Sequence, residues 1–486
     1  MDGPVIPAEI PNLIGGGEEA AIAGEWFEKT SPIEESVLAR VARSRAADID
    51  TAVTAARQAQ EAWAARTVVA RGDLLRDLAL LLRERRDQAS AIVAAETGKS
   101  PSLARGETDA AVEMGLFVAG EGRRFYGRTT TASMAHRAVS THRQPLGVAG
   151  LLISFNTPLP NVAWKVFPAL LCGNAAVLKP SEETPASAWF FGRLATEVGL
   201  PPGILNIVHG RGPEAGAPLA AHPDVDLVSF TGSAETGRLV NMAAAERLAK
   251  VCLELGGKNA LVVCDDADLD RAVQWTLQSA FSNAGQRCAA ASRVVVMDEV
   301  YDTFRDRLVV AARGLTVGSR DEDALGPVIS SRSLERILEA VGQATQAGAK
   351  VIAGGRRMDG PGWHLEPTLL EEVPAASSVL REELFGPVAT LQRAGSFEEA
   401  IAIVNDSPYG LTAAVHTGSV HRAMRFAERV RTGVVVVNAG THGSEPHMGF
   451  GGLGLSGTGW REAGVEALDV YSDWKAVNVV TDPGLA

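Results

Sequence analysis

Cys288 has the most reactive sequence context of the four cysteines. It lies in Asn283-Ala-Gly-Gln-Arg-Cys288-Ala-Ala, between a predicted helix and a predicted strand. Arg287 precedes it, and an adjacent cation favours the thiolate, which is the nucleophilic form. A lone cysteine is more often structural than catalytic, so this context indicates a candidate nucleophile and no more. The others lie among apolar residues, as buried inert thiols do: Cys172, Cys252 and Cys264.

Glu254 is a carboxylate on an otherwise apolar predicted strand, in Leu253-Glu-Leu-Gly-Gly-Lys258. Burial would raise its pKa toward the range that suits a general base. The alternative is a salt bridge to Lys258, because a buried charge is costly unless it is paired. From this residue alone, the salt bridge is the favoured interpretation.

A phosphate-binding turn is one interpretation of Phe230-Thr231-Gly232-Ser233. The segment follows a predicted strand and opens a helical stretch, so free backbone N–H groups and the helix dipole would face a phosphate. The other interpretation is a plain turn with Ser233 as the helix N-cap, and the context does not choose. Two glycine-rich motifs, at 452–457 and 15–20, follow no good strand, so we interpret both as loops.

The elements that must position these residues alternate between strand and helix. Residues 47–95 predict two long helices. Strands are predicted at 148–154, 175–178, 204–208, 227–230 and 251–255, with helices at 163–171 and 186–198. After Gly256-Gly257 the alternation resumes, with strands at 261–264, 294–297, 388–391, 411–416 and 434–437 and helices at 269–281, 300–313, 334–346, 397–405 and 420–429. This pattern predicts two α/β units built on parallel sheets.

Composition narrows the class of protein. The 486 residues are 46% hydrophobic and 21% charged, which predicts two or three globular domains. A net charge of −12 argues against nucleic-acid binding. The apolar runs stay below the roughly 18 residues of a membrane span, and the N-terminus does not read as a signal peptide. Sparse cysteines without C-x-x-C pairs suit a reducing compartment, so we expect a cytoplasmic protein.

Taken together, these segments resemble the aldehyde dehydrogenase superfamily. Seven motifs occur in that family's order between residues 24 and about 475: Ser154-Phe-Asn156-Thr-Pro158, Lys179-Pro-Ser-Glu182, Phe230-Thr-Gly-Ser233, Leu253-Glu-Leu-Gly-Gly-Lys258, Gly285-Gln-Arg-Cys288, Glu382-Glu-Leu-Phe-Gly-Pro387, and Phe450-Gly-Gly452 with Ser456-Gly457. Any one of them alone would be a weak signal.

The resemblance implies oxidation of an aldehyde to an acid. Cys288 would form a hemithioacetal and then a thioester, and Glu254 would activate the water that hydrolyses it. Asn156 would donate to the oxyanion together with the backbone N–H of Cys288. Lys165 and Glu462 match positions linked to proton relay, although Trp460 interrupts the usual pattern beside Glu462.

The resemblance also implies a dinucleotide site. Lys179 and Glu182 would hold the adenosine ribose, and Ser233 would face the pyrophosphate. Glu383 would hold the nicotinamide ribose, with Phe385 near the ring. The full expected set is Lys179, Ser181, Glu182, Phe230, Thr231, Gly232, Ser233, Leu255, Gly256, Glu383 and Phe385. NAD is expected, with NADP as the alternative, because a carboxylate at 182 repels a 2′-phosphate.

The implied fold is α/β: a Rossmann-like cofactor domain (1–125 and 145–256), an α/β catalytic domain (257–456) and a small β oligomerisation arm (126–144 and 457–486). The polar segments 126–143 and 457 onward should pair as this arm and reach another subunit. The resemblance implies a homodimer or a homotetramer. A CoA-acylating relative and a non-catalytic member remain alternatives, and an intact Cys288, Asn156 and Glu254 set argues against both.

Several residues fall where the family builds its substrate tunnel: Thr157, Asn161, His442, Glu445 and His447. Arg287, beside the nucleophile, is a further candidate substrate residue. Hydrogen-bonding groups there predict a polar aldehyde. Glu445 would add a negative charge across the tunnel, so the prediction is a positively charged amino-aldehyde in preference to an anionic semialdehyde. The opposing residue is Arg287, whose cation could instead favour a carboxylate. We interpret His442-Gly-Ser-Glu445-Pro-His447 as polar loop residues and expect no metal, because the mechanism needs none.

Overall fold

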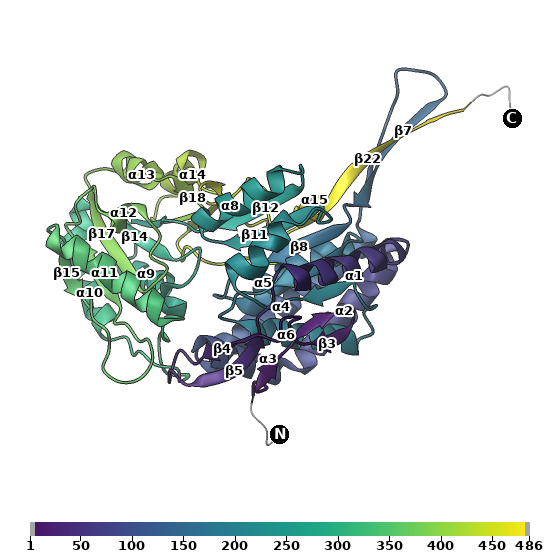
Figure 1. Ribbon diagram of the computed structural model, residues 1–486. Coiled ribbons are helices and arrows are strands. Elements are labelled where there is room, and N and C mark those ends of the chain that lie inside the picture. The colour runs from purple at the N-terminus through teal and green to yellow at the C-terminus, as the bar shows by residue number, and fades with distance from the viewer. Residues whose placement is uncertain (1–4, 482–486) are drawn as a thin grey trace.

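Two seven-stranded sheets organise the chain in the computed structural model, which describes residues 5–481. They form the two lobes of Figure 1. The first sheet has the order β12-β11-β8-β9-β10-β2-β3. Its parallel strands are β8 (Val148–Leu152), β9 (Ala175–Lys179), β10 (Leu205–Ile207), β11 (Leu227–Gly232) and β12 (Lys250–Leu255), and β2 (Asn12–Ile14) and β3 (Gly17–Glu19) add an antiparallel edge. Strands β8 and β9 are buried over their whole lengths because both faces of the sheet are covered.

Residues 47–95 form three helices, and the expectation of two was wrong. They are α1 (Ala46–Ala64), α2 (Val68–Glu84) and α3 (Arg86–Thr97). The break before α2 is marked by Thr67, which caps the helix by accepting a hydrogen bond from the N–H of Ala70 at 3.1 Å. Alanine, leucine and arginine favour helix on both sides of each break, so composition does not reveal the breaks.

Helix α4 (Pro101–Gly120) was not predicted, because its internal glycines lower helix propensity. Gly115 has a packing reason: a Cβ there would stand 2.6 Å from the Phe167 ring and 2.8 Å from the Ala79 Cβ. The glycine therefore lets α4 approach α2 and α5 (Pro158–Leu171) closely. The first lobe also contains α6 (Pro185–Glu197), α7 (Ala217–Ala221), α8 (Ala234–Ala245) and α15 (Ala467–Tyr471), with the short turns η1 (Glu121–Arg123) and η2 (Gly212–Gly216).

The second sheet has the order β15-β16-β17-β14-β13-β19-β20. All neighbouring strands are parallel except β15 and β16, which pair with each other antiparallel. The sequence did not predict these two strands. The strands are β13 (Asn259–Val263), β14 (Ala291–Met297), β15 (Lys350–Ala353), β16 (Thr368–Glu371), β17 (Val388–Ala394), β19 (Thr412–His416) and β20 (Val434–Val437). The helices are α9 (Leu269–Phe281), η3 (Ser282–Gly285), α10 (Asp298–Arg313), α11 (Ser331–Gln346), α12 (Ser378–Arg381), α13 (Phe397–Asn405) and α14 (Val420–Arg429).

Two small sheets complete the lobes. One is β1 (Glu9–Ile10), β5 (Val37–Ala42) and β4 (Trp26–Thr30), and the other is β18 (Tyr409–Gly410) with β21 (Leu453–Gly454). The chain passes from the first seven-stranded sheet to the second in the short segment between Leu255 and Asn259. Within residues 5–481, no helix combines the length and the apolarity that crossing a membrane requires.

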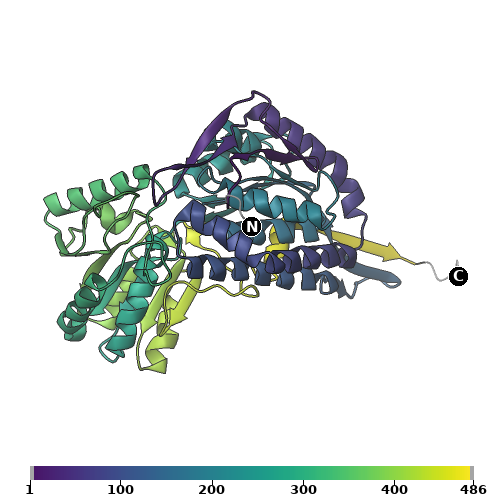
Figure 2. The ribbon, with the colours of Figure 1, turned by 90° about the horizontal axis from the view of Figure 1, so that it is seen from below.

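An antiparallel arm projects from the first lobe (Figures 1 and 2). Its strands are β6 (Arg128–Thr130), β7 (Arg137–Pro145) and β22 (Ser472–Val480), so the two polar segments do pair. Residues 457–471, which were expected in the arm, lie instead on the first lobe. They carry Ala463, Leu468 and Tyr471, which are buried in that lobe's core. The C-terminal part of the chain joins the arm only at Ser472.

Candidate active site

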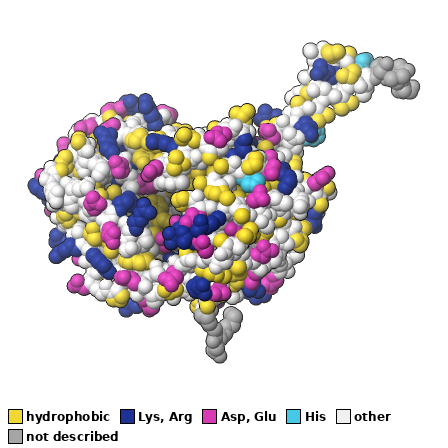
Figure 3. Space-filling model, in the orientation of Figure 1, with side chains coloured by type: hydrophobic (Ala, Val, Ile, Leu, Met, Phe, Trp, Pro, Cys, Tyr) yellow, Lys and Arg dark blue, Asp and Glu magenta, His cyan; other side chains and the backbone are white. Residues whose placement is uncertain are grey.

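The first sheet has a topological switch point at β8, where the chain moves from one side of the strand to the other. Strands β9 and β10 follow on one side of β8, and β11 and β12 lie on the other. Ligands bind outside the carboxyl ends of the strands at such a switch point. Asn156 follows β8, Ser233 follows β11, and Glu254 lies near the end of β12. Figure 3 shows the surface hollowed between the two lobes, with charged side chains around the hollow.

The backbone of Cys288 is held in place by the second lobe. Asn259 Nδ2 donates to the carbonyl oxygens of Cys288, at 2.7 Å, and Ala290, at 3.0 Å. The loop before the cysteine contains two non-glycine residues with left-handed backbone, Asn283 (φ 55°) and Ala284 (φ 52°). Such conformations cost energy and persist where the surroundings fix them, so the fold constrains the cysteine loop to one geometry.

Arg287 does not make the neighbouring thiol acidic. Burial raises the pKa of Cys288 to about 12, and the charges of Glu383 and Glu254 add to this rise, while Arg287 opposes it. The adjacent cation acts in the expected direction, but its effect on the pKa is smaller than the opposing effects. Loss of solvation for the thiolate, together with two nearby carboxylates, outweighs one cation. Attack by this thiol requires that its proton be removed during the reaction.

Glu254 is buried without a partner. Its exposed fraction is 5%, and neither carboxylate oxygen has a hydrogen-bond partner among the described residues. Burial raises its pKa well above the usual value, and the charge of Glu462 adds to the shift. The salt bridge to Lys258 was a wrong interpretation, because no ion pair joins these two described residues. The carboxylate is therefore free to accept a proton.

Lys165 and Glu462 form a buried ion pair next to Glu254. Ser229 joins the pair: its hydroxyl accepts from Lys165 Nζ and donates to Glu462 Oε1, both at 2.7 Å. Trp460 does not displace Glu462, since backbone pairing with Phe450 fixes the position of Glu462. The charges of Glu462 and Lys165 act on the Glu254 pKa in opposite directions, so the three groups form one electrostatic unit.

Asn156 is buried and held by residues that the sequence did not single out. Lys99 Nζ donates to its carbonyl oxygen at 2.6 Å, and Asn283 Nδ2 donates to the same oxygen at 3.1 Å. Lys99 also pairs with Glu107 on α4. No local pattern marks these contacts, because they join residues far apart in the chain. The one available signal was a charged pair at the start of α4.

The expected adenosine-side and phosphate-side residues cluster at the carboxyl ends of β9 and β11. Lys179 is buried and pairs with Glu182 at 3.3 Å. Ser233 is the N-cap of α8, where its hydroxyl accepts from the Thr236 N–H at 3.3 Å. Ser181 accepts from the Glu183 N–H at 3.2 Å. Phe230 is largely buried, whereas Thr231 and Gly232 are partly exposed just before the N-terminus of α8.

The remaining expected cofactor residues lie where the two lobes meet. Glu383 Oε1 accepts from the Gly257 N–H at 3.0 Å, and burial raises the pKa of Glu383 to about 7. A Cβ at Gly256 would collide with the Glu383 carboxylate. Phe385 packs edge-on against Phe155, with ring centroids 5.6 Å apart. Leu255 packs on Gly237 of α8. Carboxylates on either side of a helix N-terminus are an arrangement that suits a dinucleotide.

The family model for the aldehyde dehydrogenase family matches residues 20–477. This chain belongs to the aldehyde dehydrogenase family. It is an NAD(P)-dependent oxidoreductase that acts on aldehydes.

Three similar aldehyde dehydrogenases illustrate the match. The α-ketoglutaric semialdehyde dehydrogenase of Bacillus subtilis is 35% identical over 475 residues, covering 96% of this chain and 97% of its own. The crystal structure of Escherichia coli lactaldehyde dehydrogenase has a TM-score of 0.95 and 35% identity, over 98% and 100% of the two chains. Betaine aldehyde dehydrogenase from Staphylococcus aureus, in complex with NAD+, has a TM-score of 0.95 and 31% identity, over 98% and 96%.

The expected substrate residues of this aldehyde dehydrogenase differ in their exposure. Thr157 precedes α5 and is partly exposed, and Asn161 is buried one turn further on. Arg287 is partly exposed and forms no ion pair with any of residues 5–481. Glu445 is exposed on a loop, and the nearby His442 has its pKa lowered to about 4 by burial. No group of three His, Cys, Asp or Glu side chains spaced for a metal occurs in the described part of the chain.

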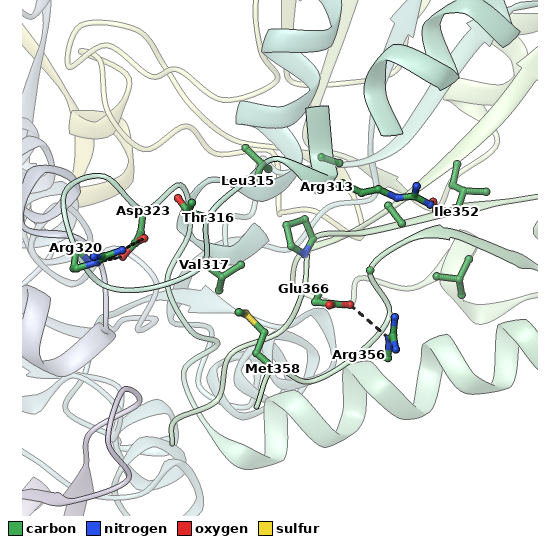
Figure 4. Close-up of a pocket in the computed structure, with 15 residues that line it drawn as sticks. Arg313, Leu315, Thr316, Val317, Arg320, Asp323, Ile352, Arg356, Met358 and Glu366 are labelled. Atoms are coloured by element: carbon green, nitrogen blue, oxygen red, sulfur yellow. Dashed lines mark hydrogen bonds and ion pairs between the residues drawn. The ribbon is translucent and has the colours of Figure 1, made fainter. Parts of the chain in front are cut away.

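A second hollow, of about 700 Å³, lies in the second lobe and contains none of these residues (Figure 4). Its arginines already have partners. Arg320 pairs with Asp323, Arg356 stands 3.9 Å from Glu366, and Arg313 donates to the Ile352 carbonyl oxygen at 2.8 Å. Two of these three arginines of the aldehyde dehydrogenase therefore already face a carboxylate, and we place no ligand in this hollow.

Proposed function

We propose that Cys288 attacks the aldehyde and that Glu254 activates the water that hydrolyses the resulting thioester. The buried and unpartnered carboxylate of Glu254 carries this proposal, because a general base must be free to accept a proton. Asn156 Nδ2 and the Cys288 backbone N–H stabilise the developing oxyanion. Bound NAD(P) supplies the acceptor for the hydride that leaves the hemithioacetal. Glu462 and Lys165 pass the proton of Glu254 onward.

Measuring NADH formation with and without CoA tests this function. Acid release without CoA supports hydrolysis by water. A strict need for CoA would instead make the enzyme acyl-transferring, with CoA replacing water in the second half-reaction. No NADH from any of a panel of aldehydes, under either condition, would point to a non-catalytic member of the family.

We assign the cofactor contacts by their places along the site. Lys179, Ser181 and Glu182 hold the adenosine end. The second group, which lies at the pyrophosphate, is Phe230, Thr231, Gly232 and Ser233. The third group, which lies at the nicotinamide end, is Leu255, Gly256, Glu383 and Phe385. The Glu182 side chain is partly exposed and pairs with Lys179, which supports its assignment as the acceptor for a ribose hydroxyl.

Replacing Glu182 with glutamine should raise the use of NADP relative to NAD. The carboxylate accepts hydrogen bonds from a ribose 2′-OH and repels a 2′-phosphate, so its loss should shift the ratio of kcat/KM values by about tenfold. The neighbouring variant Glu183→Gln is the control, because Glu183 pairs with Lys29 instead. A wild-type enzyme that strongly prefers NADP would contradict the assignment.

We propose that the aldehyde is polar and carries a carboxylate. The relatives' names cover an anionic, a hydroxylated and a cationic aldehyde, so membership of the family does not choose the charge. Arg287 adjoins Cys288, and its Nε is buried without a partner. Lys99 pairs with Glu107, so Glu107 is not left to compensate the charge of Arg287. Glu445, which favoured an amino-aldehyde, is exposed on its loop and adds little field at the thiol.

Replacing Arg287 with glutamine should therefore lower kcat/KM for a carboxylate semialdehyde by about 10- to 100-fold, the strength of one charge-assisted hydrogen bond. An unsubstituted aldehyde of equal length should change little. Arg356→Gln, an exposed arginine of the second lobe, is the control. Highest kcat/KM of the wild type for a matched amino-aldehyde would reject the carboxylate and restore the role of Glu445.

We propose that the enzyme is a homodimer or homotetramer built through the arm. The outer arm strands have unpaired edges, and Trp474, Val479 and Val480 are exposed on β22. Exposed apolar edges of this kind suit pairing with a second copy. The division into a cofactor domain (1–125 and 145–256), a catalytic domain (257–456) and the arm remains part of this proposal. All four cysteines are free thiols, which fits a cytoplasmic location.

A further inference from the structure

The backbone of Asn156 is fixed from two sides. Lys99 reaches it from the start of α4, and Asn283 reaches it from the loop that carries Cys288. Both side chains donate to the same carbonyl oxygen, so the backbone position is set independently of the side-chain amide. What remains to be set is the rotation of that amide, which presents either its NH₂ group or its oxygen to a reacting carbonyl.

Asn161 makes the contact that chooses between these two rotations. It lies in the first turn of α5 and is buried. Its Nδ2 donates to the Ser154 carbonyl oxygen at 3.2 Å and to Asn156 Oδ1 at 3.3 Å. With Oδ1 engaged, the NH₂ group of Asn156 faces the other way. Among residues 5–481, no atom accepts a hydrogen bond from Asn156 Nδ2.

We infer that Asn161 is a positioning residue that keeps the Asn156 amide turned with its NH₂ group toward the oxyanion. This inference rests on the proposed role of Asn156. A donor that is already oriented costs no reorganisation when charge develops, whereas a turned amide would place oxygen lone pairs against the oxyanion. The Ser154 carbonyl oxygen anchors Asn161 itself, because that oxygen can only accept. Asn161 therefore acts through Asn156 and does not need to touch the substrate.

Two variants separate orientation from packing. Asn161→Asp keeps the shape but, once ionised, can only accept, so Asn156 must turn its NH₂ group toward position 161. We expect kcat to fall by about 10²–10³-fold, as when an oxyanion donor is lost. Asn161→Leu removes the partner and leaves both amide rotations accessible, so about half the molecules stay competent and kcat falls only about twofold. A packing role predicts the opposite order, with the isosteric variant harmless.

The pH profile and a double variant complete the test. Burial raises the pKa of an introduced carboxyl, and its protonated form can still donate to Asn156 Oδ1. The kcat of Asn161→Asp relative to wild type should therefore fall as pH rises. In Asn156→Ala, adding Asn161→Asp should cost nothing more. A further loss in that background, or Asn161→Leu slower than Asn161→Asp, would overturn the inference. Full activity of Asn156→Ala would overturn the proposed oxyanion role instead.

Discussion

Replacing Cys288 with alanine will abolish aldehyde oxidation and leave NAD binding intact. The loop around Cys288 is held by its backbone, through Asn259 and through Asn283, so loss of the thiol should not disturb the site. Without a nucleophile no hemithioacetal forms, and kcat should fall by at least about 10⁴-fold, as in other enzymes that lose their nucleophile. Steady-state NADH formation measures the loss, and NAD titration by fluorescence checks binding.

The matched control is Cys264→Ala. Cys264 is buried behind β13, and burial raises its pKa to about 12, so it is an inert thiol. This variant should keep wild-type kcat even if it is slightly less stable. Substantial turnover by purified Cys288→Ala, or a comparable loss in Cys264→Ala, would show that the nucleophile lies elsewhere.

Replacing Glu254 with glutamine will separate the two halves of the reaction. NADH should appear in a rapid burst equal to the number of active sites, followed by steady turnover slowed by about 10²–10⁴-fold, the usual contribution of a general base. The amide is nearly isosteric and cannot take a proton from water, so the thioester accumulates. Rapid mixing with absorbance detection measures both phases, and Glu428→Gln, on the exposed face of α14, is the control.

The pH dependence supplies a second check on Glu254. Its pKa is raised, so the carboxyl is protonated and inactive as a base below that pKa, and the hydrolytic rate of the wild type should rise as pH increases through it. Glu254→Gln should lose this rise. A variant that turns over like the wild type would make Glu254 structural and assign the water to another base.

The alternation of strands and helices could be predicted because strands covered on both faces are nearly continuous apolar runs. Val148–Leu152 and Ala175–Lys179 are examples. Helix α4 escaped prediction because Gly115 is explained only by the Phe167 ring against it, and that contact is tertiary. The position of the residues after Gly457 on the first lobe was not predicted, because this segment begins with polar residues. Leu468 and Tyr471, further along it, are buried in that lobe.

The candidate site divides in the same way. Cys288, Glu254 and Asn156 could be proposed from the sequence because local motifs carry them. The protonation of Cys288 was not, because it depends on burial and on Glu383, which lies 95 positions away in a sequence of 486. The contact between Lys99 and Asn156 likewise joins two segments of the first lobe that are far apart in the sequence and meet only in the folded protein. A local motif can therefore indicate which side chain reacts, whereas the groups that set its pKa and orientation are brought to it by the fold.

The path of the chain between β21 and the arm limits how this enzyme can be shortened. Gly457 pairs with Glu254, Glu462 neutralises Lys165, and only then does α15 lead into β22. A truncation meant to produce single subunits by removing the whole tail would also strand a buried lysine without its counter-ion, which is strongly destabilising. An engineered monomer should therefore keep the chain through Tyr471 and alter the arm from Ser472 onward.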